Sequence, residues 1–478
     1  MKKIFTSLFL AAVCMACSDI LEEKPKSLAS ENFYNTAAEA KAAVNAIYGP
    51  MRTDPALSTN YPAQLEGLAD YGNSRGTQTP VSLYQGLDNT NINRVATIWD
   101  NFYQSIRNAN LVIANVPKGT GMTDAEKASF VAEAKYMRAL IYFALVRNWA
   151  GVPLRTEENM TEPDIPRSSV DDVYKLIVAD ALVAESGLPD NPSEIGRPTK
   201  WAAKTLLSEV YMYLAQWQPS SAKAKEVIDS KKYSLVAVST SEDFQKIYGP
   251  EVVNTSEEIF YFKYSRQQGF GLVSYAHRKI GQYNYYGPGG VYAQYTDSVS
   301  NPVIKNWDFK DLRKNHILYN VDIGLGTTSM LFRKYRDPLA TGGAGNDYPW
   351  YRYADLLLFH AEADARANGK PTAEALESLN KVHRRAYGKP ADAVSTVDFK
   401  LADFTLQTFI DKVVQERGYE TMYEGKRWND LKRLGIAKQR ILEVKNIVVA
   451  EKHMLWPIPN SEILYNKAIT AKDQNPGY

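Results

Sequence analysis

The sequence predicts a mainly α-helical protein, a helical scaffold that carries one large irregular insertion of loops and short strands. Apolar residues recur at helical spacing in most segments between the glycines and prolines. Alanine is dense in these segments, and tyrosine and tryptophan fill positions between the aliphatic residues. Residues 233–349 lose this periodicity and hold short strand-like runs, such as residues 258–264, between glycine-rich turns.

Residues 1–16 predict a secretory signal peptide. Lys2 and Lys3 form a basic start, and the apolar run of residues 4–16 is too short to span a bilayer. Ala16 stands directly before Cys17, which resembles the site cut by the lipoprotein signal peptidase. We therefore expect Cys17 to be the acylated first residue of the mature chain, with lipid as its membrane contact. An ordinary signal peptide with an incidental cysteine is the alternative.

Helical patterns then follow one another in a single expected domain, residues 17–478. Thr123 and Glu126 form a capping box at the start of a long helix that stops at Trp149, before Gly151 and Pro153. The other helices expected from the spacing cover residues 30–48, 96–116, 168–186, 199–216, 351–368, 372–386, 406–423 and 425–434.

These helices fall in two units, about 30–232 and 350–440. Pairs of helices joined by short turns, with alanine where helices touch, are typical of tetratricopeptide arrays. The repeat length is irregular, so an irregular helical domain is the alternative. Residues 54–94 are polar and show no helical stripe, and we expect them, like the insertion, to form functional loops.

Composition and motifs exclude several classes of function. Both cysteines lie in the N-terminal segment, so we expect no disulfide, thiolate catalyst or cysteine zinc site. The net charge of +2 gives no support to nucleic-acid binding. The five histidines show no metal-ligand spacing, and no phosphate loop or dinucleotide fingerprint is present. We therefore expect no metal and no cofactor.

Glu416, Glu420 and Glu424 share one face of a predicted helix and are the strongest catalytic candidates. A glycosidase needs two carboxylates about 5 to 10 Å apart in a cleft, and this spacing could supply them. The nearby cations Arg417 and Lys426 favour a structural ion-pair network instead. We expect no catalytic residue here.

Aromatic residues in the loops are the better candidates for a binding site. Sugar rings have apolar C–H faces that stack on aromatic rings, and their hydroxyls require polar partners. Loop tyrosines and a tryptophan stand among asparagine, glutamine, aspartate and arginine in two regions. The alternative is that each ring packs within its own loop. The candidate ligand-binding residues are Tyr71, Arg75, Tyr84, Asn89, Tyr283, Tyr285 and Trp307.

Motifs in a fixed order resemble the SusD/RagB family of nutrient-uptake lipoproteins, from Cys17 to Tyr478. They include WDNFYQSIRNAN at 99–110, AEAKYMRALIYFALVRNWAGVPL at 132–154, RYADLLLFHAEA, ERGYETMYEGKRWNDLKRLG and the ending LWPIPNSEI…QNPGY. The resemblance implies four tetratricopeptide-like units and a lipoprotein of the outer membrane, exposed at the cell surface. It also implies an oligosaccharide ligand, passed to a SusC-like TonB-dependent transporter, with an aromatic platform from the two loop regions.

Three other functions compete with this expectation. A peptide-binding member of the same family would differ only in its ligand. A glycoside hydrolase would need an isolated carboxylate pair in a cleft, which the sequence does not show. A purely structural helical adaptor would leave the aromatic loops and Cys17 unexplained.

Overall fold

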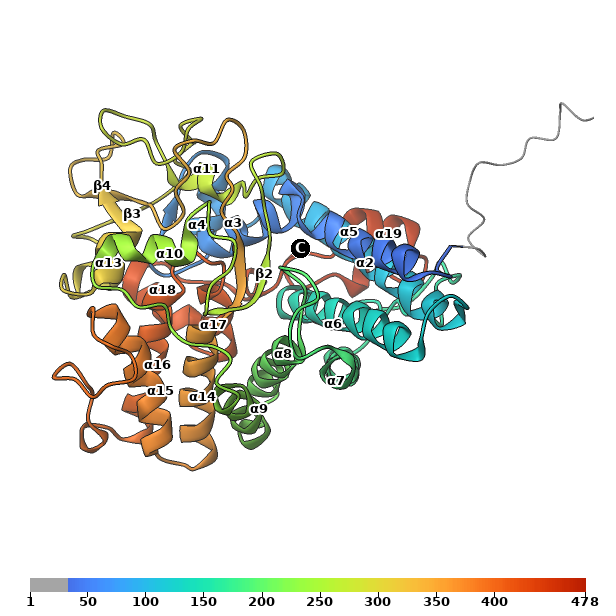
Figure 1. Cartoon of the computed structure of the whole chain (residues 1–478). Helices are drawn as coiled ribbons and strands as arrows, with labels where there is room; N and C mark the ends of the chain where they lie inside the picture. Colours follow the sequence, from blue (N-terminus) through green and yellow to red (C-terminus); the bar gives the residue numbers. More distant parts are fainter. Residues whose placement is uncertain (1–32) are drawn as a thin grey trace, which may run out of the picture.

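The computed structural model describes residues 33–478, so the expected signal peptide and Cys17 lie outside the described residues. The described part is mainly helical and has few strands, as the sequence predicts. Its helices follow one another along an arc, with most of the long loops gathered at one end of it (Figure 1). The structural class is therefore that of a helical array with an attached insertion.

The first half of the array consists of α2 (Ala37–Met51), α5 (Asn89–Asn115), α6 (Asp124–Trp149), α7 (Val170–Gly187), α8 (Lys200–Tyr213) and α9 (Trp217–Asp229). The second half consists of α14 (Tyr353–Ala367), α15 (Ala373–Ala386), α16 (Leu406–Glu420) and α17 (Arg427–Arg433), followed by α18 (Ala437–Lys445) and α19 (Asn460–Tyr465). From α5 to α9 each helix packs on the next, and α9 packs directly on α14. The array is thus continuous in space although the insertion divides it in sequence.

Side-chain caps fix where several of these helices begin. The Thr123 hydroxyl accepts the N–H of Glu126, and the Glu126 carboxylate accepts the N–H of Thr123, which confirms the predicted capping box of α6. Ser169 caps α7 and Thr372 caps α15 in the simpler one-sided way. These caps fall within two residues of the predicted starts.

The expectation of a loop over residues 54–94 is wrong for most of that segment. It contains α3 (Asn60–Gly67) and the short α4 (Thr79–Ser82), and α5 already begins at Asn89. Residues 61–67 of α3 are all buried, including Gln64 and Glu66. A helix buried on every side needs no apolar stripe, so periodicity gave no signal for it.

The strands form two small antiparallel sheets within the described residues. The four-stranded sheet has the order β1 (Asn73–Ser74), β3 (Gln294–Asp297), β5 (Ser329–Phe332) and β4 (Leu318–Asn320). The two-stranded sheet pairs β2 (Glu258–Phe262) with β6 (Tyr348–Arg352), which confirms the predicted strand near residue 258. Because β1 pairs with β3, the segment around residue 73 is drawn onto the insertion.

Most buried apolar side chains belong to one core that runs through the array and into the insertion. A second, small apolar cluster lies apart from it, in the four-stranded sheet. In the described part of the chain, no helix combines the length and the hydropathy needed to cross a membrane.

Candidate ligand-binding site

The second apolar cluster carries a group of five tyrosines, four of which keep part of their surface exposed. Its buried centre is made by β4, β5 and the residues between them: Tyr319, Val321, Ile323 and Leu331. Four half-buried rings pack against this centre from the adjoining loop and from β3. We call the five rings the tyrosine cluster: Tyr283, Tyr285, Tyr292, Tyr295 and Tyr319.

Three rings of the tyrosine cluster are in mutual contact. The ring centroids of Tyr285 and Tyr319 are 4.9 Å apart with an interplanar angle of 74°. Tyr283 lies 5.1 Å from Tyr319 and 6.0 Å from Tyr285. Edge and tilted arrangements at these separations are favourable for aromatic pairs, so the rings hold one another in place.

The sheet brings two distant parts of the sequence to this place. Asn73 of β1 is paired with Tyr295 of β3, and the N–H of Arg75 donates to the carbonyl of Ala293 at 2.8 Å. The guanidinium of Arg75 also donates to the carbonyl of Ile323 at 3.3 Å. The two loop regions that the sequence singles out thus meet at Arg75.

A tight backbone contact positions Tyr292. The N–H of Tyr292 donates to the carbonyl of His277 at 2.9 Å, and Gly290 lies against the same carbonyl. Gly290 has φ +73°, and a Cβ there would stand 2.6 Å from the His277 oxygen. Glycine is therefore needed at this turn, for its conformation and for the close approach.

Arginine side chains flank the tyrosine cluster. The guanidinium carbons of Arg75 and Arg278 lie 4.5 and 4.9 Å from the ring centroid of Tyr292. Arg333 lies 5.5 Å from the ring centroid of Tyr285 and donates to its hydroxyl at 2.8 Å. Arg336 lies 5.6 Å from the same centroid. The site therefore combines aromatic rings with a high density of hydrogen-bond donors.

Three of the predicted ligand-binding aromatics lie elsewhere, and their burial argues against a ligand-facing role. Tyr71 is 1% exposed, and its hydroxyl bonds to Glu66 and to the N–H of Tyr423. Tyr84 is 6% exposed and donates to the carbonyl of Leu68. The polar residues around these tyrosines in sequence gave no sign that the rings point inward.

Trp307 is also buried, at 2% exposure. It stacks on Tyr419 of α16 with centroids 4.2 Å apart and planes 5° from parallel. Its indole N–H donates to Asp311 at 2.8 Å. This ring packs the insertion onto α16, so we remove it from the candidate site.

The other predicted residues remain compatible with a site. Tyr283 and Tyr285 belong to the tyrosine cluster, and Arg75 contacts it. Asn89 is exposed at the first residue of α5, and among the described residues its side chain has no hydrogen bond to the cluster.

Sequence reasoning missed several members of the site: Tyr295, Tyr319, Arg278, Arg333 and Arg336. One signal was available for Tyr319, because it alternates with Val321 and Ile323, two more members of the small apolar cluster. The arginines had no such signal: Arg278 lies in a loop, and Arg333 and Arg336 lie together just after β5.

A second concave surface lies on another part of the molecule. A groove of about 740 Å³ runs between α16 and α18, and side chains of both polar and charged types line it. Arg427 and Arg440 at this groove both bind the buried carboxylate of Asp70, at 2.8 and 2.9 Å. These two arginines are thus already paired with a carboxylate of the chain, whereas Arg75, Arg278 and Arg333 of the tyrosine cluster form no salt bridge among the described residues.

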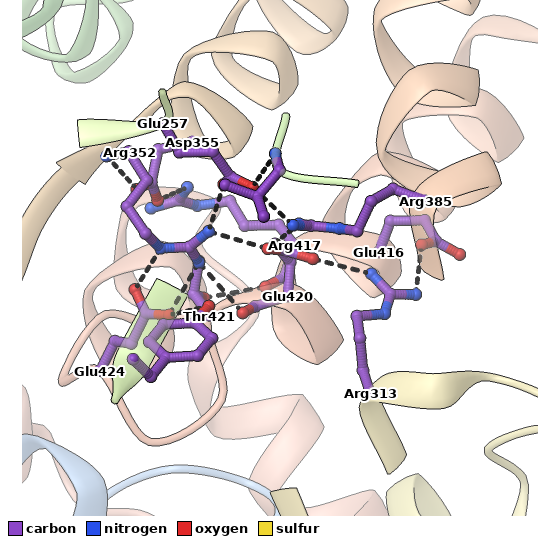
Figure 2. Close-up of polar contacts among 12 residues, drawn as sticks. Glu257, Arg313, Arg352, Asp355, Arg385, Glu416, Arg417, Glu420, Thr421 and Glu424 are labelled. Carbon is purple, nitrogen blue, oxygen red and sulfur yellow. Dashed lines mark hydrogen bonds and ion pairs between the residues drawn. The ribbon is translucent and has the colours of Figure 1, made fainter. Parts of the chain in front are cut away.

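Glu416 and Glu420 of α16 form the ion-pair network that their sequence context favours, together with Glu424, which lies in the turn after the end of α16 and not on the predicted helix face (Figure 2). Glu420 binds Arg352 at 2.8 Å, and Glu424 binds Arg352 at 2.7 Å. Glu416 binds Arg313 at 2.7 Å. We call the buried charges around these three glutamates the α16 network: Glu257, Asp311, Arg313, Lys334, Arg352, Asp355, Arg385, Glu416, Arg417, Glu420, Glu424 and Lys426.

The ionisation of these glutamates is set by their partners. Burial by itself would raise the pKa of Glu420, but Arg385 and Arg352 outweigh it and hold the pKa well below its ordinary value. Arg313 and His383 likewise lower the pKa of Glu416 to about 2, against the effect of burial. A general acid needs a raised pKa, so these carboxylates fit a structural network and do not fit an acid–base pair.

Comparison with known proteins agrees with this architecture. A family model described as "SusD family" matches residues 281–478, and one described as "Starch-binding associating with outer membrane" matches residues 19–212. SusD-like protein P2 of Formosa agariphila is 27% identical over 532 aligned positions that span all of both chains.

Solved structures show the same fold. A SusD homologue from Bacteroides thetaiotaomicron superposes with a TM-score of 0.82 at 22% identity, over 94% of this chain and 98% of that one. A laminarin-binding SusD-like protein superposes with a TM-score of 0.76 at 23% identity, over 93% and 100% of the two chains. The two family models cover most of the sequence from opposite ends, and the relatives and the fold agree with both. The chain belongs to the SusD family.

Proposed function

We propose that this protein binds a glycan at the cell surface and delivers it to a SusC-like TonB-dependent transporter, without cleaving it. The observation that carries the proposal is the tyrosine cluster, a group of half-buried rings flanked by guanidinium groups. Rings of this kind stack on the C–H faces of sugars, and the guanidiniums donate to sugar oxygens. The laminarin-binding relative supports a carbohydrate as the ligand class.

The anchor in this proposal is a lipid on Cys17, which lies outside the described residues. The family description names association with the outer membrane, which supports that location. A chain held by lipid and a short tether keeps a high effective concentration at a membrane partner, so the contact can open and close without loss. Transport itself would be the work of the barrel, which we infer from the family resemblance.

Binding assays on the soluble chain test the first part of the proposal. We expect Tyr285→Ala and Tyr283→Ala to weaken glycan binding several-fold, because stacking on one ring contributes about 0.5 to 1.5 kcal/mol beyond burial. Tyr465 is 77% exposed on α19, away from the cluster, so Tyr465→Ala is the matched control. Calorimetry against a panel of glycans measures the affinities, and thermal melting checks the fold.

The same panel separates the alternatives. Equal affinity for both cluster variants and the wild type would place the site elsewhere. Binding of peptides with no binding of glycans would favour the peptide-binding alternative. Release of reducing ends from a bound glycan would show that the protein is an enzyme. Co-purification of a TonB-dependent barrel from membranes in gentle detergent tests the partner.

A further inference from the structure

The arginines around the tyrosine cluster have unused positive charge. Among the described residues, Arg75, Arg278 and Arg333 form no salt bridge: their contacts are rings, a hydroxyl and backbone carbonyls. Arg336 pairs with Glu242 at 2.8 Å, and that carboxylate is 59% exposed. Four guanidiniums therefore stand within reach of the rings, and one of them has a carboxylate partner.

The exposed carboxylate of Asp322 is close enough to Arg278 for the two charges to interact. Asp322 lies at the turn between β4 and β5, where the N–H groups of Gly324 and Gly326 lower its pKa and Arg278 adds to that effect. One of its oxygens accepts both N–H groups, at 2.7 and 3.1 Å. Part of the negative charge of Asp322 is therefore already used in the hydrogen bonds that stabilise this turn.

The lack of carboxylate partners for Arg75, Arg278 and Arg333 indicates what kind of ligand the site would bind. Neutral sugar hydroxyls donate as well as accept, so a site built for a neutral glycan needs acceptor side chains beside its donors. Guanidinium groups only donate, and their planar fork matches carboxylate, sulfate and phosphate oxygens. The four guanidiniums offer donors only, so the acceptors among the rings and arginines are the tyrosine hydroxyls, and that of Tyr285 already accepts from Arg333.

We propose that the glycan bound by the tyrosine cluster is acidic, with carboxylate or sulfate groups on its sugars. The rings of Tyr283 and Tyr285 would stack on the sugar faces, and Arg75, Arg278 and Arg333 would bind the acidic groups. Tyr292 would hold Arg75 and Arg278 in place, because both guanidiniums lie over its ring. This inference rests on the proposed function, and it adds the charge of the ligand.

A matched pair of polymers tests the charge separately from the sugar. Polygalacturonate carries one carboxylate per residue, and full methyl esterification removes the charge but keeps the backbone. Dextran sulfate and dextran form a second pair, and laminarin is a neutral probe. We expect the soluble chain to bind an acidic member at least about tenfold more tightly than its neutral counterpart. Raising the salt to about 1 M, where charges are screened beyond about 3 Å, should remove most of this difference.

Arginine variants test the residues. Arg278→Gln and Arg333→Gln should each weaken binding of the acidic polymer about tenfold, with little change in melting temperature. Arg278→Lys keeps the charge but loses the planar fork, so it should recover part of the affinity. Arg107 is exposed on α5 and forms no salt bridge among the described residues, so Arg107→Gln is the control for net charge.

The outcomes separate this inference from the proposed function. Preference for the acidic members, lost in Arg278→Gln and Arg333→Gln and kept in Arg107→Gln, supports it. Binding of laminarin or dextran with equal or weaker binding of the acidic polymers overturns the acidic ligand and leaves the glycan-binding function standing. An absence of binding to every polymer overturns both.

Discussion

The α16 network and the tyrosine cluster use arginine in opposite ways. In the network, Arg352 and Arg385 are fully buried, and each binds two or more carboxylates of the same chain. In the cluster, Arg75 and Arg278 are half-buried against one tyrosine and bind none. Burial of a charge is tolerated only with a partner. The difference supports the proposal that the partner of Arg75 and Arg278 comes from outside the chain.

The largest effect should come from breaking the network. Glu420→Gln leaves Arg352 and Arg385 short of a buried partner, and loss of one side of such a pair typically costs about 3 to 5 kcal/mol. We expect the free energy of unfolding to fall by that amount in urea denaturation. Asp411→Asn, at an exposed position of the same helix, should change it by less than about 0.5 kcal/mol. A near-neutral Glu420→Gln would mean that the network does not hold the fold.

A smaller but still large effect should follow from Trp307→Ala. The ring is buried on Tyr419, and truncation of a buried tryptophan costs about 3 to 5 kcal/mol, less where the site collapses. We expect a lower melting temperature and, in the folded fraction, unchanged glycan affinity. Tyr285→Ala should give the reverse pattern. If Trp307→Ala lost glycan affinity with an unchanged melting temperature, Trp307 would be part of the binding site after all.

The smallest effect of the three concerns the geometry of the cluster. Gly290→Ala places a Cβ against the His277 carbonyl at a positive φ, and strain of this kind costs about 1 to 3 kcal/mol. We expect a modest fall in melting temperature together with weaker glycan binding, because Tyr292 shifts. Gly342→Ala, where no atom lies within 4 Å of the added Cβ, is the control. Unchanged binding in Gly290→Ala would show that Tyr292 takes no part.

The helical part of the fold could be predicted because its signals are local. The caps at Thr123, Ser169 and Thr372 and the apolar spacing behind them fix the starts of α6, α7 and α15. Several helices were not predicted from the sequence, among them α3, α9 and α18. The helix α3 is buried on all sides, and α9 starts on a polar stretch with Pro219 in its first turn.

The site could be predicted only in part, because exposure is a tertiary property. The polar neighbours of Trp307 suggest a ring in solvent, yet its partner Tyr419 lies far along the chain. Conversely, the arginines of the cluster come from three separate segments, at residues 75, 278 and 333–336, and the pairing of β1 with β3 and of β3 with β5 brings the first and the last of these together. Sequence spacing carries no information on such pairing.

The direct contact of α9 with α14 has a consequence for how this scaffold can vary. Because β2 and β6 pair antiparallel, with Glu258 opposite Arg352, the chain leaves and rejoins the array side by side. Because the two ends of the insertion are neighbours, the insertion can be replaced by another segment while the helical array keeps its structure. Such a graft would have to bring its own counterparts of Glu257, Arg313 and Lys334. These ions join the segment to Glu416, Glu424, Arg352 and Arg385. The segment could then change in sequence, and with it the ligand preference, while the helical array stays the same, provided that these ion pairs are kept.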